Sequence, residues 1–283
     1  MKTERACAYC GHGSDLTNEH VLPKCFRKTF KAITTAKTPA GEKAILADLE
    51  IHDVCSGCNH GPLSRLDTYL CELNDKYFLK IVRPGDHVRF EFDFDQLLRV
   101  LLKIGYNVAR ARKWPLGNWQ EVPLYILGTS PCPSGFRVFV QLMIPTPVQR
   151  TNLPVLPGTT EVPPLPLRVY PDDVSSYPGL ISVHWVSFWS YRFFVLQEDT
   201  QVPRGKREQA IAKWLRKKKG AKELNRRGVA TMYASSVMVL DGANESPIFH
   251  EQLSKARELK SAMELKKSRS PGDKQATRRS GGG

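Results

Sequence analysis

The chain has 283 residues and carries 42 Lys and Arg against 28 Asp and Glu, a formal net charge of +14. Hydrophobic residues at 41% and charged residues at 25% are ordinary globular values and exclude a wholly disordered chain. No apolar run is long enough for a membrane span, and no apolar core follows the first five residues as in a secretory signal. We therefore expect an intracellular protein, cytoplasmic or associated with the nucleoid, in which cysteines are thiols or metal ligands.

The positive charge is concentrated at one end of the chain. Residues 1–80 hold 11 basic and 10 acidic side chains, residues 81–200 hold 11 and 10, and residues 201–283 hold 20 and 8. This surplus predicts a polyanionic partner, with nucleic acid ahead of an anionic membrane surface. The alternative is that the charge serves solubility alone.

Two C-x-x-C pairs separated by 44 residues mark the N-terminal region, Cys7-Ala8-Tyr9-Cys10 and Cys55-Ser56-Gly57-Cys58. Each pair lies beside a glycine, so two thiolates can meet one tetrahedral ion, and four thiolates form a closed structural zinc site. The alternative is one redox pair with incidental cysteines. Three further cysteines lack partners at ligand spacing and are expected to be plain buried thiols: Cys25, Cys71 and Cys132.

An acid-histidine motif lies between the two pairs, in Asn18-Glu19-His20-Val21-Leu22-Pro23. The second pair continues as Cys58-Asn59-His60-Gly61 into a predicted helix that carries Asp67. This order of motifs resembles the HNH endonucleases, over residues 5–75, about a quarter of the chain. The resemblance implies a zinc-stapled ββα-metal fold and metal-dependent hydrolysis of phosphodiester bonds.

The resemblance also assigns roles to individual residues. His20 matches the general base, and imidazole can take a proton from water near neutral pH. Glu19 and Asp67 match ligands of a catalytic Mg²⁺ or Mn²⁺. Asn59 matches the middle letter of the family name, and its amide would tie the His20 strand to the loop. The family often has His or Asn where this chain has Asp67, so an inactive HNH-like domain used only for binding is the alternative.

Basic residues follow the acid-histidine motif in the loop before Ile51. Those nearest the proposed base could hold phosphates on either side of the cut, and a solvated basic loop is an equal alternative. They are Lys24, Arg27 and Lys28.

The middle of the chain has the composition of an α+β domain. Apolar residues at near-helical spacing predict a long buried helix over 94–112, with Asp93 or Asp95 as its cap. Thirteen of the twenty prolines lie in 115–178 and exclude long helices there. Strands are expected over 122–127, 136–144, 180–189 and 191–196, with an extended loop over 145–171.

A basic amphipathic segment over 206–219 follows, then a possible strand over 229–240 and a helix-like stretch over 250–267. Such a cationic stripe tracks phosphates without reading bases, and a localisation signal would look similar. Its expected nucleic-acid contacts include Arg216, Lys217, Lys218 and Lys219.

Together these features predict an α+β protein. We expect an HNH nuclease-like module with a Cys₄ zinc site over 1–82, an α+β region over 83–200, a basic region over 201–267 and a disordered tail over 268–283. The expected function is an HNH endonuclease with Zn²⁺ and Mg²⁺ or Mn²⁺, acting on DNA in preference to RNA and not on membranes. The alternatives are an inactive zinc-stabilised nucleic-acid-binding protein and an RNA-directed nuclease.

Overall fold

The structure, a computed structural model, describes residues 6–13, 15–29, 33–38, 41–46, 50–116, 119–147, 161–162, 168–172 and 174–234. Its contacts divide the chain into two units, the larger of which contains residues 1–32 and 47–241. An antiparallel hairpin of β2 (Ile33–Thr38) and β3 (Gly41–Leu46) belongs to the other unit. The predicted helix over 250–267 and the tail over 268–283 lie outside the described residues. No helix in the described part is both long and apolar enough to cross a bilayer.

The motif-bearing region forms an antiparallel strand pair followed by a helix. β1 (Leu16–His20) pairs with β4 (Glu50–Cys55), with His20 opposite Glu50. The chain then continues without a loop through α2 (Ser56–Cys58), the π-helix η1 (Asn59–Leu63) and α3 (Ser64–Leu73). A strand pair followed by a helix is a general arrangement, so it leaves the HNH assignment a prediction.

A disulfide joins the short helix after β1 to α3. α1 (Lys24–Thr29) carries Cys25, which is bonded to Cys71 of α3 with Cα atoms 5.7 Å apart. The prediction that these two cysteines are plain thiols was therefore wrong. They are 46 residues apart in sequence, and only the contact between α1 and α3 brings them together. Cys132 is a free, half-buried thiol.

The predicted long helix is confirmed as α4 (Phe94–Ala111), capped by Asp93, whose side chain accepts a hydrogen bond from the Gln96 N–H. It is preceded by the π-helix η2 (Asn74–Phe78) and β5 (His87–Glu91), and β5 pairs with β13 (Val229–Tyr233).

The expected strand over 122–127 is instead a helix, α5 (Val122–Leu127). A short buried apolar run fits either element by periodicity. Here Pro123 lies in the first turn and Gly128 ends the helix with a φ of 76°, and both are helix-boundary signals.

The predicted strands over 136–144, 180–189 and 191–196 belong to one antiparallel sheet, whose strand order is β12-β6-β11-β10-β9. Its members are β6 (Phe136–Leu142), β9 (Arg168–Asp172), β10 (Leu180–Phe188), β11 (Tyr191–Glu198) and β12 (Lys222–Glu223). The loop expected over 145–171 contains the start of β9 and a two-residue pair, β7 (Thr146–Pro147) and β8 (Glu161–Val162).

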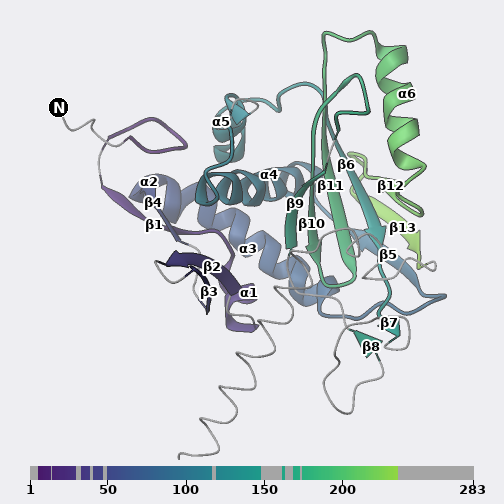
Figure 1. Ribbon diagram of the computed structural model, residues 1–283, viewed down its shortest axis with the longest axis horizontal. Helices are drawn as coiled ribbons and strands as arrows, with labels where there is room; N and C mark the ends of the chain where they lie inside the picture. The colour runs from purple at the N-terminus through teal and green to yellow at the C-terminus, as the bar shows by residue number, and fades with distance from the viewer. Residues whose placement is uncertain are drawn as a thin grey trace, which may run out of the picture. The chain divides into compact units, whose positions relative to one another are not determined.

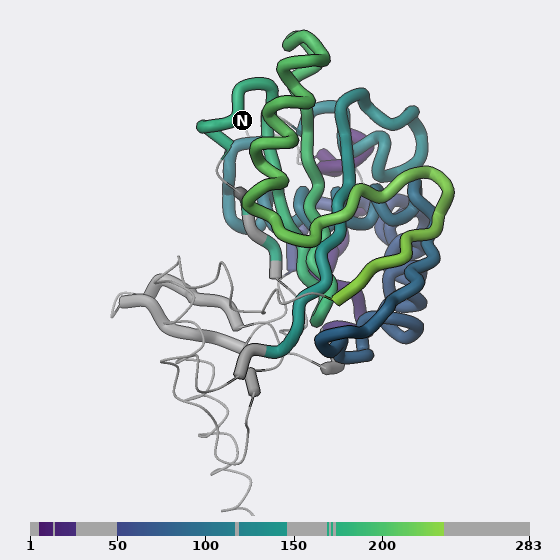
Figure 2. The backbone as a smooth tube through the Cα atoms, turned by 90° about the vertical axis from the view of Figure 1, so that its right-hand side faces the viewer, coloured from purple at the N-terminus to yellow at the C-terminus, as the bar shows by residue number. Residues whose placement is uncertain are grey.

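Helices cover both faces of this sheet, as Figure 1 and Figure 2 show. Phe193 and Val195 of β11 belong to the core shared with α3 and α4, whereas Phe194 and Leu196 pack with Trp214 of α6 (Arg204–Leu215). Burial on both sides explains why these strands are continuous apolar runs. α6 and the α3–α4 pair therefore lie on opposite faces of the sheet.

Candidate functional site

The four cysteines of the two C-x-x-C pairs form one cluster. The sulfur atoms of Cys7, Cys10, Cys55 and Cys58 all lie within 4.8 Å of one another, and the Sγ atoms of Cys10 and Cys55 are 3.6 Å apart. Four thiolates around a tetrahedral zinc have sulfur–sulfur distances of about 3.8 Å, given a Zn–S bond of about 2.3 Å. The cluster thus fits a structural metal ion. It is the one group of three or more such ligands in the described part of the chain.

The surroundings of the cluster affect its thiols unequally. Burial raises the pKa of Cys7, but hydrogen bonds from the backbone N–H groups of Cys55 and Cys10 outweigh it and lower that pKa to about 7. Burial and the neighbouring thiols raise the pKa of Cys58 well above its usual value. His12 adds a polar contact, its Nδ1 lying 3.3 Å from the Cys10 sulfur. A coordinated cation would deprotonate all four thiols, since metal-bound thiols lose their protons outright.

His20, the predicted general base, ends β1 on the open face of the strand pair. Its side chain is 31% exposed, and its Nδ1 lies 3.3 Å from Oε1 of Glu50, close enough for an ion pair but not aligned as a hydrogen bond. Asn18 donates a hydrogen bond to the other Glu50 oxygen at 2.9 Å and contacts His52 Nδ1 at 2.7 Å. His20 therefore faces a carboxylate within an exposed polar cluster.

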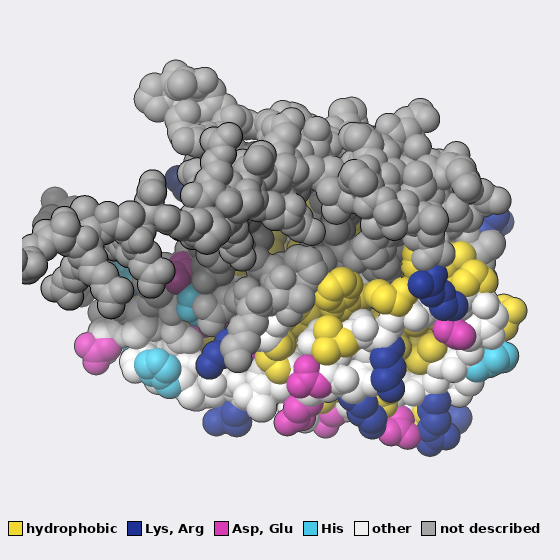
Figure 3. Space-filling view, turned by 90° about the horizontal axis from the view of Figure 1, so that it is seen from below, with side chains coloured by type: hydrophobic (Ala, Val, Ile, Leu, Met, Phe, Trp, Pro, Cys, Tyr) yellow, Lys and Arg dark blue, Asp and Glu magenta, His cyan; other side chains and the backbone are white. Residues whose placement is uncertain are grey.

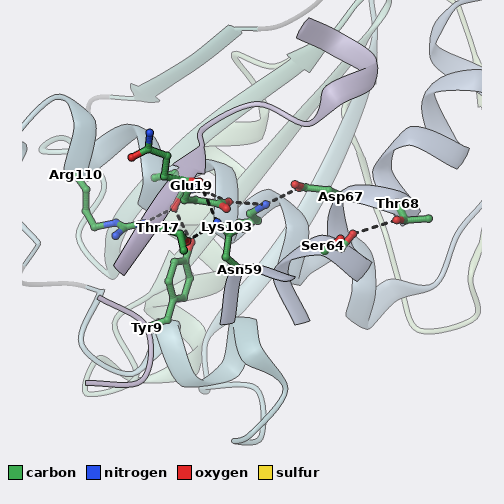
Figure 4. Close-up of polar contacts among 11 residues, drawn as sticks. Tyr9, Thr17, Glu19, Asn59, Ser64, Asp67, Thr68, Lys103 and Arg110 are labelled. Carbon is green, nitrogen blue, oxygen red and sulfur yellow. Dashed lines mark hydrogen bonds and ion pairs between the residues drawn. The ribbon is translucent and has the colours of Figure 1, made fainter. Parts of the chain in front are cut away.

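Asn59, the first residue of η1, fastens that helix to β1. Its amide nitrogen donates to the backbone oxygen of Asn18 at 3.0 Å and to Oγ1 of Thr17 at 2.8 Å (Figure 4). Thr17 in turn donates to the backbone oxygen of Val54 in β4. These bonds span the π-helix, β1 and β4, so they restrain the strand that presents His20.

Glu19 and Asp67, the predicted metal ligands, converge on one point, and a lysine occupies it. Glu19 faces inward and is 2% exposed, and its Oε1 lies 2.8 Å from Nζ of Lys103 in α4. Asp67, in the first turn of α3, places Oδ1 2.5 Å from the same nitrogen. Figure 4 shows the three side chains in line. Because neighbouring strand residues face opposite ways, Glu19 and His20 lie on opposite faces of β1.

α4 contributes a buried polar face that its apolar sequence pattern does not indicate. Asn107 is fully buried, accepts hydrogen bonds from the Tyr9 hydroxyl and Arg110, and donates to Glu19 at 3.3 Å. Arg110 also pairs with Asp53. This network links the first C-x-x-C turn, which contains Tyr9, to the Glu19 site. The signal for it was the spacing of Lys103, Asn107 and Arg110, which places all three on one face of a helix otherwise read as apolar.

Two neighbours of the motif take no part in these contacts. The Thr68 hydroxyl donates to the backbone oxygen of Ser64 within its own helix, at 3.1 Å. His60 Nδ1 lies 3.0 Å from the Ser56 hydroxyl on the exposed side of the turn. Neither side chain therefore takes the place of Asp67, which contacts Lys103.

The expected phosphate contacts fall into two separate groups. Lys24 is exposed at the start of α1, and the side chains of Arg27 and Lys28 lie outside those described. The second group follows α6, on the far face of the sheet from α3 and α4. Lys217 lies over Tyr177 and Lys218 over Trp214, with ammonium-to-centroid distances of 5.5 and 5.7 Å. Arg216 and Lys219 are exposed beside them.

In comparisons with known proteins, no family model, curated protein or solved structure matches this chain. Function is therefore inferred from the geometry of the described side chains. The cysteine cluster and the convergence of Glu19 and Asp67 on Lys103 are the two arrangements that bear on it most.

Proposed function

We propose that this chain is an HNH-type endonuclease that hydrolyses phosphodiester bonds, in DNA by preference, with a zinc ion in the cysteine cluster. The observation that carries the proposal is the convergence of Glu19 and Asp67, from two different elements, on a single cation position. The half-buried His20, next to Glu19 in sequence, adds the base that water activation requires.

His20 is suited to accept a proton from water. Its Nδ1 lies 3.3 Å from Oε1 of Glu50, so this carboxylate would pair with the imidazolium that forms when His20 takes the proton. The Asn59 bonds to Asn18 and Thr17 restrain β1 and so orient the imidazole. Asn59 is a positioning residue in this scheme, since its amide contacts the strand and not the imidazole.

The carboxylate pair fits a divalent cation by its donor chemistry. Two carboxylate oxygens are hard ligands of the kind that Mg²⁺ and Mn²⁺ take, and both point at one positive centre. Glu19 and Asp67 would hold the ion, and a cation there would act as a Lewis acid on the scissile phosphate. In the structure this centre is the ammonium of Lys103.

Basic residues of the chain support a nucleic-acid substrate. The face in Figure 3 mixes Lys and Arg with Asp and Glu over its described part, so it is not one continuous basic surface. The exposed cations after α6 offer a separate contact with phosphates, away from the site. Arg216→Glu combined with Lys219→Glu, two exposed positions, should therefore weaken DNA binding and flatten its salt dependence, and unchanged affinity and slope would assign this region to solubility or assembly.

A second candidate function is favoured by two observations. Lys103 fills the cation position, and Glu19 and His20 lie on opposite faces of β1. Both features would suit a protein that kept the zinc-stapled module for binding nucleic acid and lost the cutting reaction.

Plasmid nicking separates the two candidates. Zinc-loaded wild type and His20→Ala are compared in Mg²⁺ or Mn²⁺, with His87→Ala as a control, because His87 is exposed on β5 outside the motif. The nuclease proposal expects nicking by wild type and His87→Ala and loss in His20→Ala. Equal nicking by all three, or none with any metal, would overturn the catalytic assignment. Labelled DNA and RNA in competition then identify the preferred substrate.

A further inference from the structure

Lys103 is held in place more firmly than a surface ion pair would hold it. Its side chain is 1% exposed, and the side chain of Glu19 beside it is 3% exposed. α4 is an 18-residue helix, and Leu102 and Ile104 on either side of the lysine are buried in the core. The ammonium is therefore part of the packed interior.

The electrostatics of the pair favour a cation at this point. Two carboxylates that share a site repel one another, and a buried carboxylate without a counter-ion is costly. Nζ of Lys103 lies within 2.8 Å of an oxygen from each. Asn107 adds one further hydrogen bond to Glu19. The lysine thus supplies inside the fold the positive charge that a divalent ion would otherwise bring.

We propose that Lys103 is the resident cation of the Glu19–Asp67 pair and that a divalent ion binds there only by displacing its ammonium. An ammonium and a metal ion cannot occupy one position, and Mg²⁺ requires its ligand oxygens at about 2.1 Å, closer than those around the lysine. The free protein therefore has a closed cation site. This inference rests on one part of the proposed function, namely that Glu19 and Asp67 together can bind a metal ion.

Binding of Mn²⁺, measured by electron paramagnetic resonance, tests the inference without reference to activity. The zinc-loaded full chain is titrated as wild type, Lys103→Met, Lys103→Met with Asp67→Asn, and Lys80→Met, which removes an exposed lysine outside the network. Methionine keeps the length of the side chain and removes the charge. We expect Lys103→Met to bind one Mn²⁺ per chain about tenfold or more tightly than wild type, because the competing charge is gone. Adding Asp67→Asn should abolish that site, and Lys80→Met should match wild type.

Two results of the titration would overturn the inference. One is wild type binding Mn²⁺ as tightly as Lys103→Met, and the other is no Mn²⁺ site in the folded variant. If Lys103→Met does not fold, wild type itself is tested by ¹⁵N NMR of its lysine ammonium groups. A buried Lys103 ammonium should give a slowly exchanging signal that persists in millimolar Mg²⁺, and loss of that signal in micromolar Mg²⁺ would overturn the inference.

The outcome is separable from that of the nuclease proposal. If Lys103→Met gains a Mn²⁺ site but no form of the protein nicks plasmid, the inference about Lys103 stands and the nuclease proposal fails. If wild type nicks DNA and binds Mn²⁺ as tightly as Lys103→Met, the nuclease proposal stands and the inference about Lys103 fails.

Discussion

Lys103 of α4 and Glu19 of β1 form an ion pair, Nζ to Oε1 at 2.8 Å, in which both side chains are almost completely buried. The pair connects the region that carries the cysteine motifs to the helix at the centre of the larger unit. Because Asp67 of α3 contacts the same ammonium, three elements depend on one positive charge. The candidate site is thus also part of what holds these elements together.

Asn107 should be important for stability because its fully buried side chain connects three other polar groups. Asn107→Ala removes the acceptor for the Tyr9 hydroxyl and Arg110 and a donor to Glu19. Leaving buried polar groups unsatisfied should lower the free energy of unfolding by about 2–4 kcal/mol. Urea unfolding measures it, with exposed Asn225→Ala as the control. Similar losses in both variants would contradict a special role for the network.

Removal of the metal should unfold the N-terminal region. We predict one tightly held Zn²⁺ per chain, contributing on the order of 10 kcal/mol to folding of the module. Elemental analysis of protein purified without chelator, together with thermal unfolding before and after chelation, checks this. Cys55→Ser should lose the ion and lower the melting temperature. Retention of zinc in Cys55→Ser would count against the four-cysteine site.

The Cys25–Cys71 disulfide should stabilise the protein where it is oxidised. Closing a loop of 46 residues is worth about 4 kcal/mol in the chain-entropy model. Reduction should therefore lower the urea midpoint of wild type, and the double variant Cys25→Ser/Cys71→Ser should no longer respond to reductant. Cys132→Ser is the matched control, since Cys132 is a free thiol and its loss should preserve the response. A wild type whose intact mass shows no disulfide after oxidation would contradict the pairing.

His184 should make the fold sensitive to acid. Burial between α4 and Trp119 lowers its pKa to about 4, whereas an unfolded histidine titrates near 6.5. The stability from keeping it neutral is fully present above pH 6.5 and is lost as the pH falls toward 4. The loss is on the order of 3 kcal/mol. Between neutral pH and about pH 4, the free energy of unfolding should decrease more for wild type than for His184→Gln. An equal decrease in both proteins would show that His184 does not cause this pH dependence.

Several elements were predictable because local patterns determined them. α4 follows from apolar periodicity with Asp93 as its cap, and the four cysteines followed from their spacing and glycines. The strands β6, β10 and β11 were correctly read from runs of β-branched and aromatic residues. In each case the signal lay within the segment itself.

The failures concern relationships between segments. The disulfide depends on α1 packing against α3, which no spacing reveals. The partner of Glu19 is a lysine 84 positions away, and a lone lysine in an apolar helix gives no sign of what it will meet. The wrong prediction of a strand over 122–127 has a different cause. Pro123 and Gly128 are local signals of a helix start and a helix end, and they were stronger evidence than the apolar run between them.

The complex of His20→Ala with Mn²⁺ and a DNA duplex, examined by anomalous diffraction, tests the central claim most directly. The substitution removes the base and leaves Glu19, Asp67 and Lys103 intact. We predict a manganese peak within coordination distance of both carboxylates, the Lys103 ammonium displaced from that position, and a DNA phosphate bound at the ion. A complex in which DNA is bound while Lys103 keeps both carboxylates and no manganese peak lies between them would contradict the account.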